Sequence, residues 1–324
     1  MRRPLIVLAS VSSALVLAGC GTTEPAADSS SAKPAESITL TDASGAKVKL
    51  DGPAKKVVGT EWNVVENLVS LGVDPVGVAD VKGYTTWDTS APLTNSPKDI
   101  GTRGEPSMDT IASLSPDLIV ATTDLTASAV KQLREIAPVL QVRSANAADQ
   151  IGQIETNVDL IAQATGTTDQ AEKLKTDFDA KVAEGKKALA DAGLDGQEIA
   201  FADGYVASNQ VSIRPYTSGS LIGTVNEELG LKNAWTIKGD ENYGLATTDV
   251  EGLSDLGDVQ FAYIGSDSET SDPFADDLAK NAVWKGLPFV KKNNVHRLPD
   301  GIWMFGGQKS MEAYIDALVA ALTK

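Results

Sequence analysis

The chain has 324 residues, with 44 acidic side chains against 28 Lys and Arg, which gives a formal net charge of −16. That negative charge disfavours a nucleic-acid partner. A single cysteine excludes a disulfide framework within the chain, and a single histidine excludes a His-rich metal site. The length is sufficient to bury a core and to form two lobes.

The first twenty residues have the pattern of an export signal. Arg2 and Arg3 precede an apolar run at about 5–17, which is too short to span a membrane comfortably. The run ends in Leu-Ala-Gly-Cys20, which resembles the lipobox of bacterial lipoproteins. The resemblance implies acylation of Cys20, and two or more acyl chains anchor a protein stably. We therefore expect a lipid-anchored protein on the extracytoplasmic face of the cell membrane, the alternative being an ordinary signal peptide with an incidental cysteine.

The next two segments are predicted to be a tether and a lobe. Residues 21–37 are rich in Ser, Ala and Pro, which predicts a flexible linker. Residues 38–166 predict an N-terminal α/β lobe, in which strands and helices alternate. We expect strands at 56–60, 75–80, 117–122 and 139–142, helices at 62–72, 107–114 and 125–136, and a polar loop at 81–97.

The middle of the chain predicts a long connector. Residues 147–192 contain no strand signal, and apolar side chains recur at helical spacing between charged ones, at Ala171, Leu174, Phe178, Val182 and Leu189. An interlobe helix at 167–193 would extend about 37 Å, enough to run along both lobes.

Alternation resumes in residues 194–324, which predict a C-terminal α/β lobe. We expect strands at 197–203, 210–213, 259–265 and 295–298, and helices at 220–229, 274–280 and 308–322. The fold class is therefore α/β, with two lobes that have mainly parallel sheets and are joined by a long helix.

Catalytic and metal-binding candidates are scarce. His296 lies within NNVHRLP, where an ordinary residue in or beside a strand is expected. No G-x-S-x-G elbow occurs, and the lysine of 301–310 falls too late to fit a phosphate-binding loop. We predict no catalytic residue and no metal site.

Aromatic side chains in polar, turn-forming segments are the main candidates for ligand contact. Exposed rings are costly unless something covers them, although each could instead fold back on its own lobe. The candidates are Trp62, Tyr84, Trp87, Tyr243, Trp303 and Phe305. Trp235 and Trp284 have apolar neighbours and are predicted to be core residues.

One arginine lies between two glycines in IGTRGEPSMD. Gly101 and Gly104 allow a tight turn, and Pro106 suits the first turn of a helix. Arg103 is therefore predicted to lie at the mouth of a strand-to-helix turn, where α/β proteins meet their ligands.

Several segments together resemble a known family: residues 61–80, Tyr84 and Trp87, and then 100–120, 229–235 and 284–299. They are similar to the iron-siderophore substrate-binding proteins of ABC importers, and most resemble the ferric hydroxamate binding proteins. The resemblance covers about 38–324, and GTRGEP is its most specific part. It implies the periplasmic-binding-protein fold with a helical backbone, a shallow cleft between the lobes, and a monomer without a cofactor that does not bind iron directly.

The resemblance also implies roles for single residues. By motif position Arg103 would donate hydrogen bonds to hydroxamate oxygens, and aromatic side chains would cover the complex, namely Trp87, Tyr243, Trp303 and Phe305. Asp109 and Glu251 lie near positions where a carboxylate of each lobe docks onto the permease. Plain stabilisation of a helix N-terminus by an acid is the alternative for both.

Charge favours a hydroxamate siderophore over a catecholate. A ferric tris-hydroxamate is nearly neutral and rich in acceptors, which suits one guanidinium, whereas a tris-catecholate is strongly anionic. The candidate loops offer Arg103, Arg214 and, nearby, Lys82. Arg214 could instead pair with a surface acid. Haem or cobalamin binding and a surface-anchored carboxylate hydrolase remain the alternatives.

Overall fold

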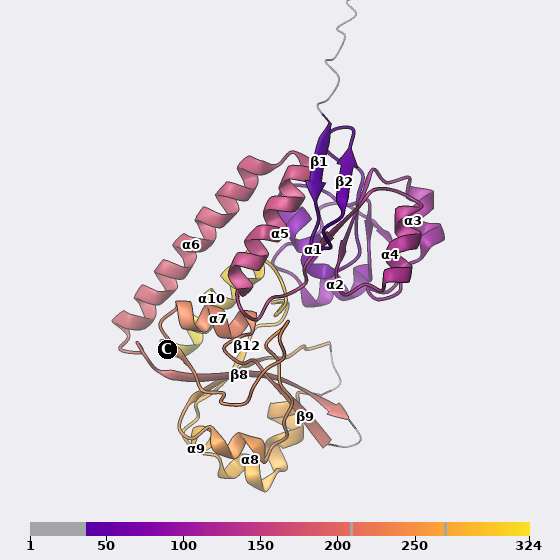
Figure 1. Ribbon diagram of the computed structural model, residues 1–324. Coiled ribbons are helices and arrows are strands. Elements are labelled where there is room, and N and C mark those ends of the chain that lie inside the picture. The colour runs from indigo at the N-terminus through magenta and orange to yellow at the C-terminus, as the bar shows by residue number, and fades with distance from the viewer. Residues whose placement is uncertain (1–36, 208–209, 269–270) are drawn as a thin grey trace, which may run out of the picture. The chain divides into compact units, whose positions relative to one another are not determined.

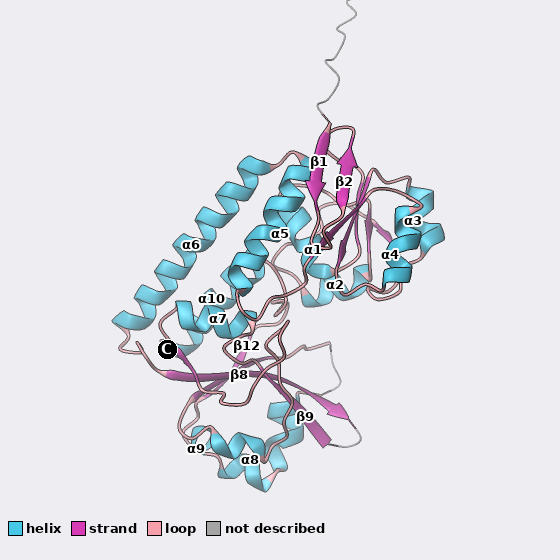
Figure 2. Ribbon diagram, viewed as in Figure 1, coloured by secondary structure: helices cyan, strands magenta, loops and turns pink. Residues whose placement is uncertain are grey.

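The computed structural model describes residues 37–207, 210–268 and 271–324. The predicted signal peptide, the lipobox with Cys20 and nearly all of the predicted linker 21–37 lie outside the described residues. The described residues form two α/β lobes (Figures 1 and 2). Among them, no helix combines the length and the apolar composition needed to cross a membrane.

The N-terminal lobe is built on a wholly parallel sheet with the order β5-β4-β3-β6-β7. Its central strands are continuous apolar runs, as expected for a sheet that helices cover on both faces. The strands are β3 (Val57–Gly59), β4 (Gly77–Val78), β5 (Lys98–Asp99), β6 (Leu118–Thr122) and β7 (Val139–Val142). The helices are α1 (Trp62–Ser70), α2 (Val81–Trp87), α3 (Met108–Leu114) and α4 (Ala127–Arg134).

Three features of this lobe differ from the predictions, the first being the short edge strand β5, which was not predicted. An antiparallel hairpin of β1 (Ile38–Thr41) and β2 (Lys47–Leu50) precedes the sheet and was not predicted. The segment 81–97 was predicted as a loop but begins with α2. Asp80 caps this helix, because its Oδ1 accepts a hydrogen bond from the Gly83 N–H at 3.0 Å. The helix has no apolar stripe, so periodicity could not reveal it.

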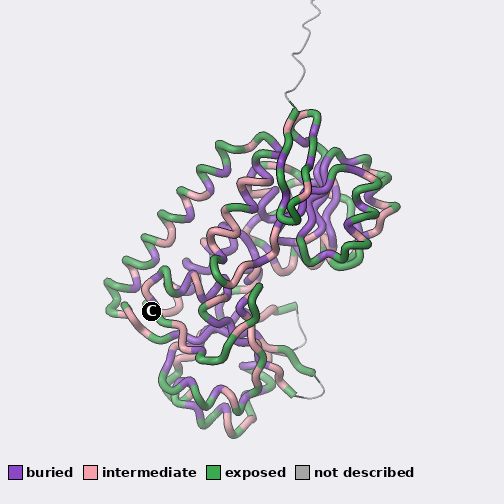
Figure 3. The backbone as a smooth tube through the Cα atoms, viewed as in Figure 1, coloured by how far each residue is buried: buried purple, intermediate pink, exposed green. Residues whose placement is uncertain are grey.

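The connector consists of α5 (Gln150–Thr165) and α6 (Thr168–Asp191). On α6, Ala171 and Leu174 belong to the core of the N-terminal lobe, whereas Phe178 and Leu189 belong to the core of the C-terminal lobe. Figure 3 shows the alternation of buried and exposed residues along this helix. The division at residues 166 and 194 stays a prediction, because Ile154 of α5 packs against both cores.

The C-terminal lobe has a second sheet with the order β10-β8-β11-β12, which is parallel, while β9 pairs with β8 antiparallel. The strands are β8 (Glu198–Ala207), β9 (Gln210–Pro215), β10 (Lys232–Asn233), β11 (Gln260–Ile264) and β12 (Val295–Leu298). The helices are α7 (Leu221–Glu228), α8 (Ala282–Gly286), α9 (Pro288–Lys291) and α10 (Gln308–Leu322). The predicted helix at 274–280 is a π-helical turn (Pro273–Asp277) followed by a 3-10 turn (Leu278–Lys280).

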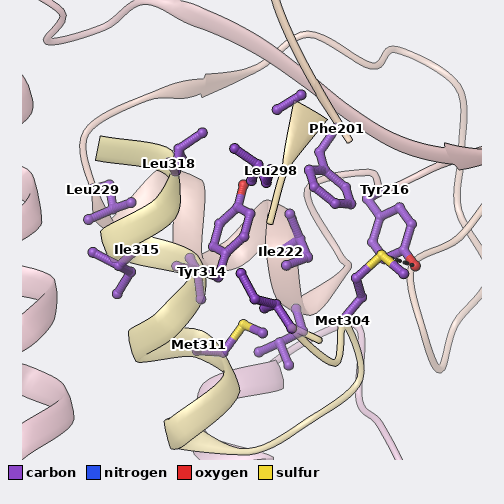
Figure 4. Close-up of a cluster of buried hydrophobic side chains, with 14 of the residues drawn as sticks. Phe201, Tyr216, Ile222, Leu229, Leu298, Met304, Met311, Tyr314, Ile315 and Leu318 are labelled. Carbon is purple, nitrogen blue, oxygen red and sulfur yellow. Dashed lines mark hydrogen bonds between the residues drawn. The ribbon is translucent and has the colours of Figure 1, made fainter. Parts of the chain in front are cut away.

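The core of this lobe is rich in aromatic rings (Figure 4). Phe201 of β8 contacts both Tyr216 and Tyr314 edge to face, a favourable geometry for aromatic pairs. Trp235 and Trp284 are buried, with 9% and 5% of their surface exposed, which confirms their prediction as core residues. His296 lies on β12, as predicted, and its Nε2 is 2.7 Å from Gln260 Oε1.

A buried carboxyl pair joins α1 to the start of α10. Glu66 Oε1 accepts a hydrogen bond from the Ser310 N–H, and its Oε2 accepts one from the Ser310 hydroxyl, both at 2.8 Å. Asp88 Oδ1 lies 3.4 Å from the same hydroxyl. Burial, and then the charge of Glu66, raise the pKa of Asp88 to about 10, and burial raises the pKa of Glu66. Asp88 therefore keeps a proton at neutral pH.

Candidate functional site: an arginine and aromatic cleft

Two adjoining cavities, of about 490 and 380 Å³, form the candidate site, and we call them together the cleft. Three side chains line both cavities, namely Arg103 from the N-terminal lobe, Arg214 from the C-terminal lobe, and Trp303. Both lobes thus contribute side chains to the cleft. Its volume lies in the range of small-molecule sites, and it combines apolar walls with a few polar groups, as such sites do.

The turn that carries Arg103 is closed by backbone contacts. Gly101 has a φ of +95°, which favours glycine, and it forms an isolated antiparallel bridge with Pro106. Ser107 then caps α3, because its Oγ accepts a hydrogen bond from the Thr110 N–H at 3.3 Å. The predicted strand-to-helix turn is present, and it places Arg103 in the cleft.

Arg103 is held between a carboxylate and two indole rings. Its Cζ lies 4.0 Å from the ring centroid of Trp62 and 5.4 Å from that of Trp303. Its Nη1 donates a hydrogen bond to Glu61 Oε1 at 2.8 Å, and the same oxygen accepts the Trp62 N–H at the start of α1. The side chain is 35% exposed, so guanidinium donors remain available to a ligand.

Arg214 pairs with an acid, and that pair lies in the cleft. Its Nε donates to Asp203 Oδ1 at 2.9 Å, and its Nη2 also bonds Asp203 Oδ2. The hydroxyl of Tyr216 donates to the same Oδ2 at 3.1 Å. The alternative of an acid partner for Arg214 is thus correct, but Asp203 is 8% exposed rather than a surface residue, and Arg214 still lines both cavities.

The structure brings most of the predicted aromatic residues together. The larger cavity is lined by Trp62, Trp87 and Trp303, and the smaller one by Tyr243, Trp303 and Phe305. Trp62 and Trp303 each present little surface, with 4% and 9% exposed, so they form the floor of the cleft.

The prediction that Tyr84 contacts the ligand is wrong. Its side chain has no exposed surface, and its hydroxyl donates to the Ala91 carbonyl, 2.5 Å away. Because α2 turns this ring into the core beside Trp62, it cannot contact a ligand in the cleft. The prediction failed because 81–97 was interpreted as a loop.

Tyr243 lines the smaller cavity and links the two lobes. Its hydroxyl donates to Asp124 Oδ2, on the loop that follows β6, and its ring meets Phe305 edge to face at 5.6 Å. Burial, and then the hydrogen bond to Asp124, raise the pKa of Tyr243, so the phenol stays protonated and remains a donor.

Several residues of the cleft were not predicted from the sequence. Glu61 and Asp203, which hold the arginines, were not identified, and neither were three aromatic residues that line the larger cavity, namely Tyr205, Tyr263 and Phe274. Tyr205 is 53% exposed, which is unusual for a ring of this size. For Tyr205 the signal was available in the sequence, because FADGYVA continues the strand pattern beyond Asp203, where the predicted strand was ended.

Asp109 and Glu251, the predicted docking residues, lie on the surface away from the cavity linings. Both are exposed: Asp109 is in the first turn of α3, and Glu251 precedes a short 3-10 helix (Gly252–Asp255).

Within the described residues, no three His, Cys, Asp or Glu side chains are grouped so that they could hold a metal ion.

Comparison with known proteins places this cleft in context. Residues 57–301 match the family described as periplasmic binding protein. The Fe(3+)-citrate-binding protein YfmC of Bacillus subtilis is 30% identical over 92% of this chain and 90% of its own length. The iron(3+)-hydroxamate-binding protein FhuD of the same organism is 28% identical over 95% and 94%. The structure of the Fe3+-Desferal-bound siderophore binding protein FhuD from Vibrio cholerae superposes with a TM-score of 0.73, at 26% identity, over 83% of this chain and 98% of that chain.

Proposed function

Since the chain belongs to the periplasmic binding protein family, we propose that it captures a ferric hydroxamate siderophore in the cleft and delivers it to an ABC permease. In its general ligand class, without a choice of siderophore type, the chain is a siderophore or iron-chelate binding protein of an ABC importer. It has no reaction of its own. The iron arrives with its donor atoms already in place, so the protein has to recognise only the surface of the chelate.

The observation that carries the proposal is the pair of guanidiniums, one from each lobe, that face one cleft among aromatic rings. Arg103 and Arg214 supply planar, permanently charged donors that match the acceptor oxygens of a hydroxamate. The rings of Trp87, Trp303 and Phe305 supply apolar contact area. A charged hydrogen bond contributes about 1.5 to 3 kcal/mol, and a ring that buries about 100 Å² contributes about 2.5 kcal/mol gross. Two arginines and three rings therefore supply about 10 to 14 kcal/mol. After an association cost of at least about 4 kcal/mol, this is close to the value of about 8 kcal/mol that micromolar binding needs.

The choice of hydroxamate follows from charge. Arg103 and Arg214 are the basic residues that line the two cavities, and Lys82 is not among them. A tris-catecholate carries three negative charges and would call for more cations than these. A ferric tris-hydroxamate is nearly neutral and needs donors rather than net charge.

Ferric citrate is the second candidate, and one observation favours it: a relative at 30% identity is named for that ligand. A carboxylate hydrolase is disfavoured, because Glu61 and Asp203 each bond an arginine and neither is a free base or nucleophile. The relatives reported above are likewise binding proteins rather than enzymes.

The remaining parts of the proposal concern location and partners. Acylation of Cys20 would tether a monomer to the outer face of the cell membrane, and residues 21–37 would give it reach. Asp109 and Glu251 would contact the permease, one from each lobe, since both are exposed and acidic.

A fluorescence titration tests the ligand directly. The purified protein is titrated with ferrioxamine, ferrichrome, ferric citrate and a ferric tris-catecholate, with quenching of the cleft tryptophans as the signal. We expect the tightest binding for a hydroxamate, and at least a tenfold loss in Arg103→Ala, about 1.4 kcal/mol. Tighter binding of ferric citrate than of both hydroxamates would replace the first candidate with the second.

A further inference from the structure

The two cleft arginines are each paired with a carboxylate that also lines the cleft. Glu61 bonds Arg103 and lines the smaller cavity, while Asp203 bonds Arg214 and lines the larger one. Two positive and two negative side chains leave a formal charge of zero among the acidic and basic residues of the lining. The cleft thus offers many hydrogen-bond donors but no net charge.

We propose that Glu61 and Asp203 set the charge selectivity of the site: they admit ferric chelates of near-zero net charge and reject anionic ones. This inference rests on the proposed function and deepens it, because it assigns the preference to residues other than the arginines. The arginines provide contacts that neutral and anionic chelates could both use. The carboxylates then decide between the two ligand classes.

The geometry of Glu61 fits this role. Its Oε1 is occupied by the Arg103 Nη1 and by the Trp62 N–H at the start of α1, so the carboxylate is fixed in position. Only one of the five guanidinium N–H groups of Arg103 is used in this bond. Glu61 therefore cancels charge while it leaves most of the donors free.

Asp203 is fixed even more firmly. It lies on β8 directly opposite Arg214 on β9, so the register of the hairpin creates the pair. The buried Tyr216 hydroxyl donates to the same carboxylate. Because Asp203 is nearly buried, its charge acts through a medium of lower dielectric than water and is felt strongly by a ligand in the cavity.

The physical consequence differs between ligands. Coulomb energy is proportional to the charge of the ligand, so a neutral chelate gains little from a change in the net charge of the site. A triply charged anion responds three times as strongly as a singly charged one. Removal of one carboxylate charge should therefore improve anion binding selectively.

The test uses two isosteric substitutions and two matched controls. Glu61→Gln and Asp203→Asn remove the charges but retain an acceptor oxygen. Glu184→Gln and Asp191→Asn remove acids that pair with lysines on α6 and that line neither cavity. Dissociation constants are measured for ferrichrome, which is neutral, and for a ferric tris-catecholate, at ionic strengths of about 0.01 and 1 M.

We expect the ratio of the catecholate to the ferrichrome dissociation constant to fall at least tenfold in Glu61→Gln and in Asp203→Asn. The fall should shrink at high salt, because it is electrostatic, and the controls should keep the wild-type ratio. A ratio that stays unchanged in both cleft variants, or that shifts equally in the controls, overturns the inference. If circular dichroism shows that Asp203→Asn does not fold, Glu61→Gln decides alone, since the Glu61 side chain is 24% exposed and the substitution keeps an oxygen that can accept the Trp62 N–H.

The wild-type measurements separate this inference from the proposed function. Failure to bind either ferrichrome or ferrioxamine would defeat the hydroxamate proposal. Equal affinity for the neutral and the triply anionic chelate would defeat the charge selectivity, while iron-chelate binding would stand.

Discussion

Trp62 of α1 and Trp303, in the segment that precedes α10, meet edge to face, with ring centroids 4.8 Å apart. Arg103 lies over both rings, and Phe305 packs against Trp303 at 5.1 Å. Both rings belong to one buried cluster with Val65, Val78 and Tyr84 of the N-terminal lobe, at the floor of the cleft. The ligand site and the core of this lobe therefore use the same side chains.

Trp303→Ala should weaken both stability and binding. Truncation of a buried aromatic side chain costs about 3 to 5 kcal/mol, and it removes one of the two rings against which Arg103 packs. Urea unfolding and chelate titration measure the two effects. Trp235→Ala, in the core of the C-terminal lobe and outside the cleft lining, is the control that should lose stability alone. Equal affinity losses in the two variants would argue against a specific role for Trp303.

Tyr205→Ala should reduce chelate affinity about tenfold with little change in stability. The ring lines the larger cavity and is 53% exposed, so the ring contributes little to the unliganded fold but could cover a bound chelate. Ile237→Ala is a matched control, because Ile237 is 40% exposed and lines neither cavity of the cleft. Unchanged affinity in Tyr205→Ala would remove this ring from the site.

Asp88→Asn should flatten the dependence of stability on pH. The pKa of Asp88 is raised to about 10 in the fold, so between pH 4 and 10 the folded state holds a proton that the unfolded chain releases. The free energy of unfolding therefore falls as pH rises, by up to about 1.4 kcal/mol per pH unit. Asparagine cannot titrate but can donate to Glu66.

The measurement for Asp88 is thermal unfolding at pH 5, 7 and 9. The wild type should lose more stability toward pH 9 than Asp88→Asn does, and Asp191→Asn on the exposed face of α6 should follow the wild type. Parallel curves for the wild type and Asp88→Asn would show that Asp88 is ionised in the fold.

Asp109→Lys combined with Glu251→Lys should abolish iron-siderophore uptake by cells without a change in chelate affinity. Both acids are exposed and line neither cavity, so charge reversal should affect only a partner surface. Radiolabelled iron uptake and chelate titration of the purified variant measure the two properties. Loss of chelate affinity in the double variant would count against docking.

The residues of the cleft show most clearly which structural features can be predicted from the sequence. Arg103 could be predicted because glycines and a proline with fixed conformational preferences surround it. The parallel sheets and α6 follow from apolar periodicity, which depends on local sequence. Asp203 could not be recognised, because its partner Arg214 is set by the register of the β8–β9 hairpin. Tyr84 was misplaced because one capping residue, Asp80, turns a polar stretch into a helix.

The most direct test is a crystal structure of the protein saturated with a ferric hydroxamate such as ferrichrome. The account predicts the chelate in the cleft, with hydroxamate oxygens within hydrogen-bonding distance, about 2.7 to 3.2 Å, of guanidinium nitrogens of Arg103. It also predicts that Glu61 and Asp203 remain bonded to their arginines. A chelate bound elsewhere, or one in the cleft without any contact to Arg103 and Arg214, would contradict it.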